Sequence, residues 1–230
     1  RAGRHDIPVI GINLGNLGFL TEVAEEEMYQ ALDQVLSGRG VIEKRMMLKV
    51  GMVGEHTERD NGPVFCLNEV AIVKGSVEKI IRLRSWADSE YINTYKADGL
   101  IVSTPTGSTA YNLSAGGPIV HAELNAILVT PICPFMLASR PVLLSPRSLI
   151  TTQLVDPADD VKVLVDGRFC WKMREKDCLV VETAAHPLKL YSSPRKSYFT
   201  IVRNKLNWGG KDSDYPLPRE VRPYNRDKDS

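Results

Sequence analysis

The residues best suited to chemistry lie in one segment, residues 98–118, which reads DGLIVSTPTGSTAYNLSAGGP. It combines an acidic residue, Asp98, with a run of hydroxyl side chains and several glycines. Small residues let a backbone approach a ligand closely, and the N–H groups of a sharp turn suit a phosphate, a ribose or a purine edge. A tight corner of small residues chosen for packing has the same composition, so the length of the segment is what favours a binding site.

Asn68 and Glu69 form a second candidate group. A carboxylate accepts two hydroxyl protons from a diol, and an amide supplies both a donor and an acceptor. A strand residue facing solvent is the alternative for Glu69, since Glu is rarely buried without a partner. Lys79 and Lys96 could offset phosphate charge, although a lysine is commonly only a solvated surface residue.

The N-terminal stretch carries a glycine-containing loop, GINLGNLGFLTE, directly after an apolar run. Its spacing matches neither the GxGxxG fingerprint nor the phosphate-binding loop that ends in Gly-Lys-Ser/Thr. The four cysteines form no CxxC pair and have no histidine cluster beside them. The sequence therefore shows no catalytic residue and no dedicated metal-ligand cluster.

Composition excludes several classes of protein. The 29 basic and 28 acidic residues leave a net charge of +1, which does not favour nucleic acid or an anionic membrane as a partner. No apolar run approaches the roughly 20 residues that span a bilayer, and no signal-peptide pattern is visible. The cysteine usage fits a reduced compartment, so we expect a cytoplasmic protein.

The elements that must position these residues change type along the chain. An apolar run at residues 7–13 predicts a strand, and residues 22–36, capped by Thr21, predict a helix. Closely spaced strand-length runs then predict an antiparallel, sandwich-like body. These runs are residues 46–53, 65–73, 80–86, 90–95, 99–103, 149–154, 162–165, 177–183 and 188–191.

Within that body, residues 104–109 predict a sharp turn and residues 110–115 a short helix that stops at Gly116 and Gly117. Asp166-Gly167 predicts a hairpin turn. A last helix is expected at residues 198–206.

We therefore predict an α/β N-terminal domain, incomplete in this chain, followed by a large β-rich, sandwich-like domain whose C-terminal segment returns to the first. The predicted boundaries are residues 1–40, 41–195, 196–210 for the returning helix and 211–230 for a tail.

Four ordered strings resemble the NAD kinase family. They are GINLGNLGFLTE, the NEV at residues 68–70, residues 98–118, and PICPFMLASRP at residues 131–141. The resemblance implies phosphorylation of NAD at the 2′-hydroxyl of its adenosine ribose, with ATP as donor and Mg²⁺ or another divalent cation, to give NADP. The family's GGDG motif, whose Asp is the proposed general base, is absent from the sequence, and we expect it to precede Arg1. Phe135 stands where the family commonly has His, and the proline-flanked segment around it is expected to hold loops rigidly between sheets.

The resemblance also implies site residues and an assembly. Asp98 would contact the nicotinamide end of the dinucleotide, and the site would lie partly across a subunit interface of a dimer or tetramer. The implied substrate-binding residues are Asn68, Glu69, Lys79, Lys96, Asp98, Thr106, Thr109, Ala110, Tyr111, Asn112, Leu113, Ser114, Asp166 and Arg168. The implied nucleotide loop comprises Asn13, Gly15, Leu17, Gly18 and Phe19.

Two alternatives remain open at this point. A kinase of the diacylglycerol or sphingosine type would share the general fold but needs an apolar or interfacial cleft for its lipid. A non-catalytic dinucleotide-binding module would bind NAD without phosphorylating it.

Overall fold

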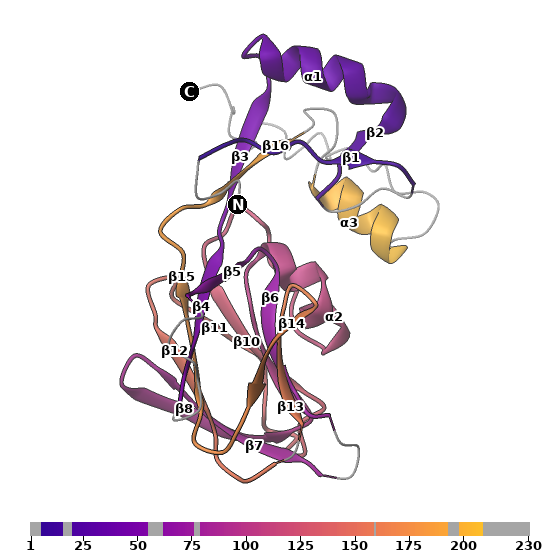
Figure 1. Ribbon diagram of the computed structural model, residues 1–230. Helices are drawn as coiled ribbons and strands as arrows, with labels where there is room; N and C mark the ends of the chain where they lie inside the picture. Colours follow the sequence, from indigo (N-terminus) through magenta and orange to yellow (C-terminus); the bar gives the residue numbers. More distant parts are fainter. Residues whose placement is uncertain are drawn as a thin grey trace, which may run out of the picture.

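The protein is built on a two-layer antiparallel β-sandwich, described here from a computed structural model (Figure 1). The structure describes residues 6–15, 20–54, 62–75, 79–158, 160–192 and 198–208. The first six-stranded sheet has the order β11-β10-β9-β6-β13-β14, and the second has the order β5-β4-β15-β12-β7-β8.

The strands of the first sheet are β6 (Glu69–Val73), β9 (Gly99–Ser103), β10 (Ile127–Ile132), β11 (Val142–Leu144), β13 (Val161–Val165) and β14 (Arg168–Met173). Those of the second are β4 (Leu48–Val53), β5 (Val64–Cys66), β7 (Ile81–Ala87), β8 (Glu90–Ala97), β12 (Ile150–Leu154) and β15 (Cys178–Thr183).

The core lies between the two sheets because apolar residues alternate along most strands. In β4, Leu48 and Val50 are fully buried, and in β13 Val161 and Val163 face the same interior. Successive side chains on a strand point to opposite faces, so each such strand contributes one face to the core. Strand β9 differs, since all five of its residues are buried, which places it in the middle of its sheet and under cover on both sides.

A smaller unit lies above the sandwich in Figure 1. It contains the parallel pair β1 (Ile12–Asn13) and β2 (Val23–Ala24), the 3-10 turn at Glu25–Glu27 and helix α1 (Met28–Leu36). Strand β3 (Val41–Arg45) leads from it into the sandwich, and β16 (Leu188–Ser192) pairs antiparallel with β3. Helix α3 (Tyr198–Leu206) follows.

Strand β16, which the predicted boundaries placed in the β-rich domain, returns to the first unit. The Tyr191 hydroxyl donates to Gln34 on α1 over 2.7 Å. The backbone nitrogen of Val9 donates to the carbonyl of Lys189 over 2.8 Å. No described helix has both the length and the apolar character that a membrane crossing requires.

Three predictions about the elements were wrong. Residues 65–73 are not one strand, since the chain breaks at Leu67 and Asn68 and enters the other sheet. The helix expected at residues 22–36 begins later, because residues 23 and 24 pair with β1 instead. The strand expected at residues 7–13 is reduced to β1 and an isolated bridge from Val9 to Leu190.

Candidate functional site

The turn at residues 104–111 is locked against the break between β5 and β6. The Thr104 hydroxyl donates to the carbonyl of Leu67 over 2.6 Å and accepts from the backbone nitrogen of Gly107 at 3.1 Å. A Cβ on Gly107 would collide with the carbonyl oxygen of Asn68, so only glycine allows this approach. The strand, the turn and Asn68 therefore form one rigid corner.

Fewer backbone N–H groups of this turn are open to a ligand than the sequence suggested. The nitrogens of Thr104, Ser108 and Ala110 donate to carbonyls within the protein, at 2.9, 3.2 and 2.9 Å. The expectation that the N–H groups of the turn serve a ligand is therefore wrong at these positions. The turn therefore offers a ligand its shape and its hydroxyl groups rather than a set of free backbone N–H groups that could bind an anion.

Glu69 is the one carboxylate of the predicted set that lies buried beside the turn. It is 6% exposed, and its Oε2 has no hydrogen-bond partner among the described residues. The backbone N–H of Tyr111 donates to the carboxylate. Burial, and secondarily the negative charge of Asp166, raise the pKa of Glu69 from its ordinary value of 4.5 to about 7. A buried acceptor without a partner is suited to a hydroxyl donor from a ligand.

Asp166 fixes the backbone that carries Glu69. Its Oδ2 accepts from the nitrogen of Leu67 at 2.9 Å, and its Oδ1 accepts from the nitrogens of Asn68 and Glu69 at 2.8 and 3.2 Å. Asp166 and Gly167 have φ values of 45° and 73°, as the predicted hairpin turn requires. Because the Asp166 carboxylate is occupied by backbone, its role here is to position the site.

Helix α2 (Tyr111–Ser114) follows the turn and divides into structural and accessible residues. Asn112 is fully buried, and its amide donates to the carbonyls of Ser108 and Pro118 while its oxygen accepts from the Thr130 hydroxyl at 2.6 Å. Tyr111 and Ser114 are exposed, and Leu113 is half-buried. Asn112 therefore supports the corner, and Tyr111 and Ser114 are free to face a ligand.

The structure places the predicted site residues in two groups at opposite ends of the sandwich. The first group comprises Asn68, Glu69, Thr106, Thr109, Ala110, Tyr111, Asn112, Leu113, Ser114, Asp166 and Arg168, and it surrounds the corner. The second comprises Lys79, Lys96 and Asp98. Asp98 precedes β9, whereas Glu69 pairs with Ser103 at the other end of that strand, so the two lie about 17 Å apart at ~3.4 Å per residue.

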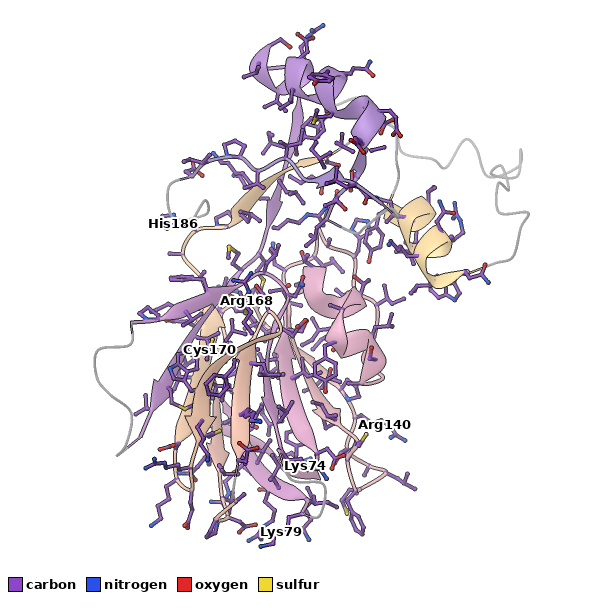
Figure 2. The ribbon with its side chains drawn as sticks, turned by 45° about the vertical axis from the view of Figure 1, so that its right-hand side comes forward. Lys74, Lys79, Arg140, Arg168, Cys170 and His186 are labelled. Carbon is purple, nitrogen blue, oxygen red and sulfur yellow. The ribbon has the colours of Figure 1, made fainter. Side chains whose placement is uncertain are left out.

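In the second group, Asp98 is already paired with a neighbouring side chain. Asp98 forms an ion pair of 2.6 Å with Lys74. Figure 2 shows Lys74 and Lys79 near the lower end of the molecule and Arg168 near the upper end of the sandwich. A single copy therefore does not bring Asp98, Lys79 and Lys96 to the corner around Glu69.

The predicted nucleotide loop is described only in part. The Asn13 side chain accepts from the backbone nitrogen of Gly15 at 3.0 Å, in an exposed turn. Leu17, Gly18 and Phe19 lie outside the described residues.

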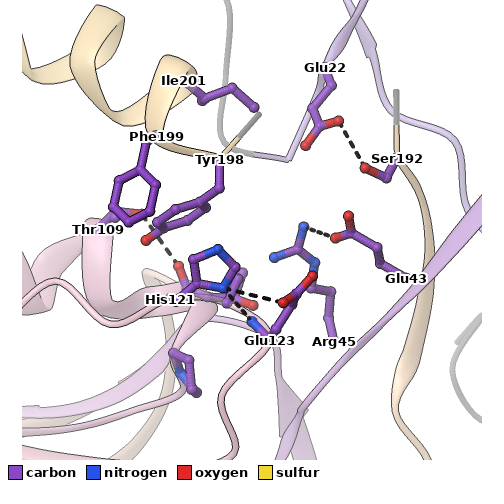
Figure 3. Close-up of a pocket in the computed structure, with 13 residues that line it drawn as sticks. Glu22, Glu43, Arg45, Thr109, His121, Glu123, Ser192, Tyr198, Phe199 and Ile201 are labelled. Atoms are coloured by element: carbon purple, nitrogen blue, oxygen red, sulfur yellow. Dashed lines mark hydrogen bonds and ion pairs between the residues drawn. The ribbon is translucent and has the colours of Figure 1, made fainter. Parts of the chain in front are cut away.

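A cavity of about 360 Å³ lies beside the turn, between the sandwich and the smaller unit (Figure 3). Its lining joins Thr106 and Thr109 to Arg45, His121 and Tyr198. Sequence reasoning missed these last three residues. The sequence offered one signal for Arg45, which is a charged residue placed directly before the apolar residues Met46 and Met47. Among the described residues, no group of three or more His, Cys, Asp or Glu could hold a metal ion by itself.

Comparisons with known proteins identify the family of the chain. Sequence models of the ATP-NAD kinase N-terminal domain and C-terminal domain match residues 1–40 and 67–193. The chain is 43% identical over 207 residues to an NAD kinase from Geotalea daltonii, covering 90% of this chain and 72% of that protein. It is 44% identical over 211 residues to an NAD kinase from Geobacter sulfurreducens, with the same coverage of 90% and 72%.

Two solved structures share the fold. A crystal structure of yeast NADH kinase complexed with NADH superposes with a TM-score of 0.82 at 28% identity, over 93% of this chain and 61% of that one. A crystal structure of an NAD kinase from Archaeoglobus fulgidus in complex with ATP gives a TM-score of 0.70 at 27% identity, over 85% of this chain and 74% of that one.

Proposed function

The chain belongs to the NAD kinase family, and on that basis we propose that it phosphorylates NAD with ATP, giving NADP and ADP. The observation that carries the proposal at the level of the site is Glu69. A buried carboxylate with one oxygen, Oε2, left without a hydrogen-bond partner among the described residues is an acceptor prepared for the hydroxyl groups of a ribose. The proposed reaction rests on the family comparison, and the proposed binding site of the acceptor substrate rests on the corner around Glu69.

The acceptor is held by a small number of groups in this proposal. The Glu69 carboxylate and the Asn68 amide bind the hydroxyls of the adenosine ribose, with Asp166 fixing both backbone nitrogens. Thr106, Thr109 and Ala110 recognise the adenine edge, where small side chains let the peptide backbone come close, and Tyr111 lies against the base. Ser114 and Arg168, both exposed, lie at the rim.

The reaction is a phosphoryl transfer to the 2′-hydroxyl of that ribose. The 2′-oxygen attacks the γ-phosphorus of ATP, the bond from that phosphorus to the β–γ bridging oxygen breaks, and ADP leaves. The hydroxyl proton passes to a general base, which the family resemblance places in a GGDG segment that the sequence does not contain. Catalysis of this kind depends on positioning and on stabilisation of charge, and the rigid corner around Glu69 provides positioning.

Mg²⁺, or another divalent cation, fits the site as an ion carried by the substrate. Mg²⁺ keeps several waters and is commonly bound by one or two carboxylates together with substrate phosphates. Glu22, Glu43 and Glu123 line the cavity beside the turn and could supply such a carboxylate. When bound, the ion would neutralise charge that develops on the β- and γ-phosphates.

We also propose that the complete site forms between copies of the chain. Asp98, Lys79 and Lys96 lie at the far end of the sandwich from Glu69, so they can serve a dinucleotide only if they face the corner of a neighbouring copy. An exposed apolar loop lies beside them, with Phe135, Met136 and Leu137 at 69%, 54% and 85% exposure, and the backbone nitrogen of Phe135 donates to the carbonyl of Lys96. Apolar side chains exposed together are typical of an interface. This loop connects β10 to β11 of the first sheet and reaches β8 of the second sheet through Lys96.

A cytoplasmic location is part of the same proposal. All four cysteines, Cys66, Cys133, Cys170 and Cys178, are free thiols in the structure. Free thiols are the usual state in a reducing compartment.

The experiment that tests the function is an assay of the purified protein with NAD, ATP and Mg²⁺, with NADP measured by an NADP-specific dehydrogenase. Formation of NADP that depends on ATP supports the kinase. Binding of NAD without any NADP would support the non-catalytic module instead.

A further inference from the structure

The segment that contains helix α2 rests on the outer face of the first sheet through a small apolar contact. A buried cluster of Ala71, Ile101 and Ile132 lies on this face. Ala115, at the end of α2, packs against the cluster. Apolar contact is non-directional, so it keeps the helix on the sheet without fixing how the helix is turned. The orientation of the residues that face the ligand therefore needs a second, directional contact.

Thr130 supplies that directional contact from the sheet. It lies on β10 two residues before Ile132, so the two side chains share the outer face. Thr130 is fully buried, and its hydroxyl donates to the side-chain oxygen of Asn112 over 2.6 Å. The Asn112 amide in turn donates to the carbonyls of Ser108 and Pro118, at 3.1 and 3.2 Å. Thr130 therefore holds a side chain that joins the turn, the helix and the segment after the helix.

The Asn112 side chain has one arrangement that satisfies it. Both hydrogens of the amide and the oxygen are used by the three bonds, in a place that no water reaches. The space around it is also filled, since a Cβ on Gly117 would collide with the Asn112 side chain. A buried amide that loses one of its partners is costly, so removal of the Thr130 hydroxyl should displace Asn112.

The backbone beside Asn112 reaches the buried carboxylate of the corner. Tyr111 directly precedes Asn112, and its backbone N–H donates to the Glu69 carboxylate. Burial, and secondarily the charge of Asp166, raise the pKa of that carboxylate to about 7, and the N–H donor of Tyr111 lowers it. The direction of this N–H is set by the first turn of α2, which Asn112 holds. Thr130 can therefore influence Glu69 without touching it.

We propose that Thr130 is a positioning residue for the acceptor substrate. It acts through Asn112, which fixes the backbone of α2 so that the N–H of Tyr111 points at the buried carboxylate. The inference rests on the proposed function, since that function assigns NAD to the corner around Glu69. Valine has the shape of threonine without the hydroxyl donor, so Thr130→Val would fill the same space and leave the oxygen of Asn112 without its partner.

Isothermal titration calorimetry with NAD tests the proposal. Thr130→Val should raise the Kd of NAD about tenfold, and Thr130→Ser, which keeps the hydroxyl, should stay within about twofold of the wild type. The matched control is Thr152→Val, because Thr152 is equally buried and its hydroxyl bonds to that of Ser85 over 2.9 Å, in the second sheet. The control should lose a similar amount of stability in denaturant and keep its affinity for NAD.

A second measurement separates positioning from a general loss of structure. Displacement of the Tyr111 N–H should raise the pKa of Glu69 further in Thr130→Val, because the charged form loses a donor. Carbon-13 NMR of the carboxyl groups measures this, with Glu69→Gln to assign the signal. The other titratable groups near Glu69 are Asp166, Cys66 and Tyr111, and the variant retains all three. Thr152→Val should leave the titration of Glu69 where it is.

Gly117→Ala protects the test against loss of fold. It disturbs Asn112 by a collision instead of a lost bond, so it should also weaken NAD and raise the pKa of Glu69. The proposal is wrong if Thr130→Val folds and binds NAD as the wild type does, or if Thr152→Val loses as much affinity. It is also wrong if Thr130→Ser binds as poorly as Thr130→Val, or if the titration of Glu69 does not move. Should Thr130→Val not fold, an unchanged NAD affinity in Gly117→Ala would overturn the proposal.

The outcome separates this inference from the proposed function, because binding of NAD is measured without turnover. If the wild type makes NADP and Thr130→Val binds NAD normally, the kinase stands and the positioning role fails. If the wild type binds NAD but makes no NADP, and Thr130→Val loses affinity, the positioning role stands and the kinase proposal fails. A wild type that does not bind NAD would overturn both.

Discussion

The carboxylate of Asp166 lies 2.8 Å from the backbone nitrogen of Asn68, 98 residues earlier in the chain. The same carboxylate accepts from the nitrogens of Leu67 and Glu69. This contact joins the β13–β14 hairpin to the break between β5 and β6, and it is what holds Glu69 at the corner.

Asp166→Ala should therefore reduce both stability and NAD binding. Three backbone donors lose their acceptor, and an unmet buried donor costs about 1–3 kcal/mol, less where water can replace the carboxylate. Chemical denaturation and calorimetry with NAD measure the two effects. The matched control is Asp88→Ala, because Asp88 also has a positive φ in a hairpin turn and accepts from the nitrogen of Leu149 at 2.9 Å. The control should lose stability and keep its NAD affinity; equal loss of affinity in both variants would argue against a special role for Asp166.

Glu69→Ala should weaken NAD binding by roughly 1–3 kcal/mol, because ribose hydroxyls lose a charged acceptor. Direct titration with NAD measures the change. Glu90→Ala is a suitable control, since Glu90 is exposed on β8. Unchanged affinity in Glu69→Ala would remove Glu69 from the site.

Stability should also depend on pH through Glu69. The pKa of Glu69 is about 7 in the folded protein, against an ordinary value of 4.5. Between these values the folded state holds a proton that the unfolded chain has lost, so the contribution of Glu69 to stability falls as pH rises from about 4.5 to about 7. The loss is on the order of 3 kcal/mol. Denaturant titrations of the wild type and of Glu69→Gln at pH 5 and pH 8 isolate it, since the variant lacks the titrating group. Parallel pH profiles for the two proteins would refute the raised pKa.

Gly107→Ala should disrupt the corner without touching a charged group. The added Cβ would collide with the carbonyl of Asn68, which is backbone and cannot turn away as a side chain could. We expect a loss of roughly 1–3 kcal/mol in stability together with weaker NAD binding. Gly51→Ala is the control, because a Cβ at Gly51 meets nothing within 4 Å. Thermal unfolding of the two variants, followed by titration with NAD, compares them, and equal behaviour would show that the corner tolerates a side chain at position 107.

A mixing experiment tests whether the site forms between copies. Glu69→Ala and Asp98→Ala should each bind NAD poorly when alone. If one copy supplies Glu69 and its neighbour supplies Asp98, mixed dimers regain intact sites, about a quarter of the total at equal mixing. Recovery of NAD-binding sites after joint unfolding and refolding measures this fraction. No recovery, in a protein shown by light scattering to be oligomeric, would place the whole site within one copy.

The sequence was sufficient to predict the elements whose patterns are local. Strand β9 and helix α3 have the predicted bounds, and the Asp166-Gly167 turn is present. The break at Leu67 and Asn68 could not be predicted in this way, because it is stabilised by Asp166, which is distant in the sequence. For the same reason Arg45 was missed: its significance comes from His121 and Tyr198, which only the folded chain brings to the same cavity. The separation of Asp98 from Glu69 likewise depends on strand direction, which residue spacing does not reveal.

The measurement that tests the central claim most directly is the identity of the product. The protein is incubated with NAD, ATP and Mg²⁺, and the dinucleotide is isolated and examined by phosphorus NMR and mass spectrometry. We predict one added phosphate, on the 2′-oxygen of the adenosine ribose, with formation of an equal amount of ADP. A protein that binds NAD at the Glu69 corner yet leaves the dinucleotide unphosphorylated would contradict the account.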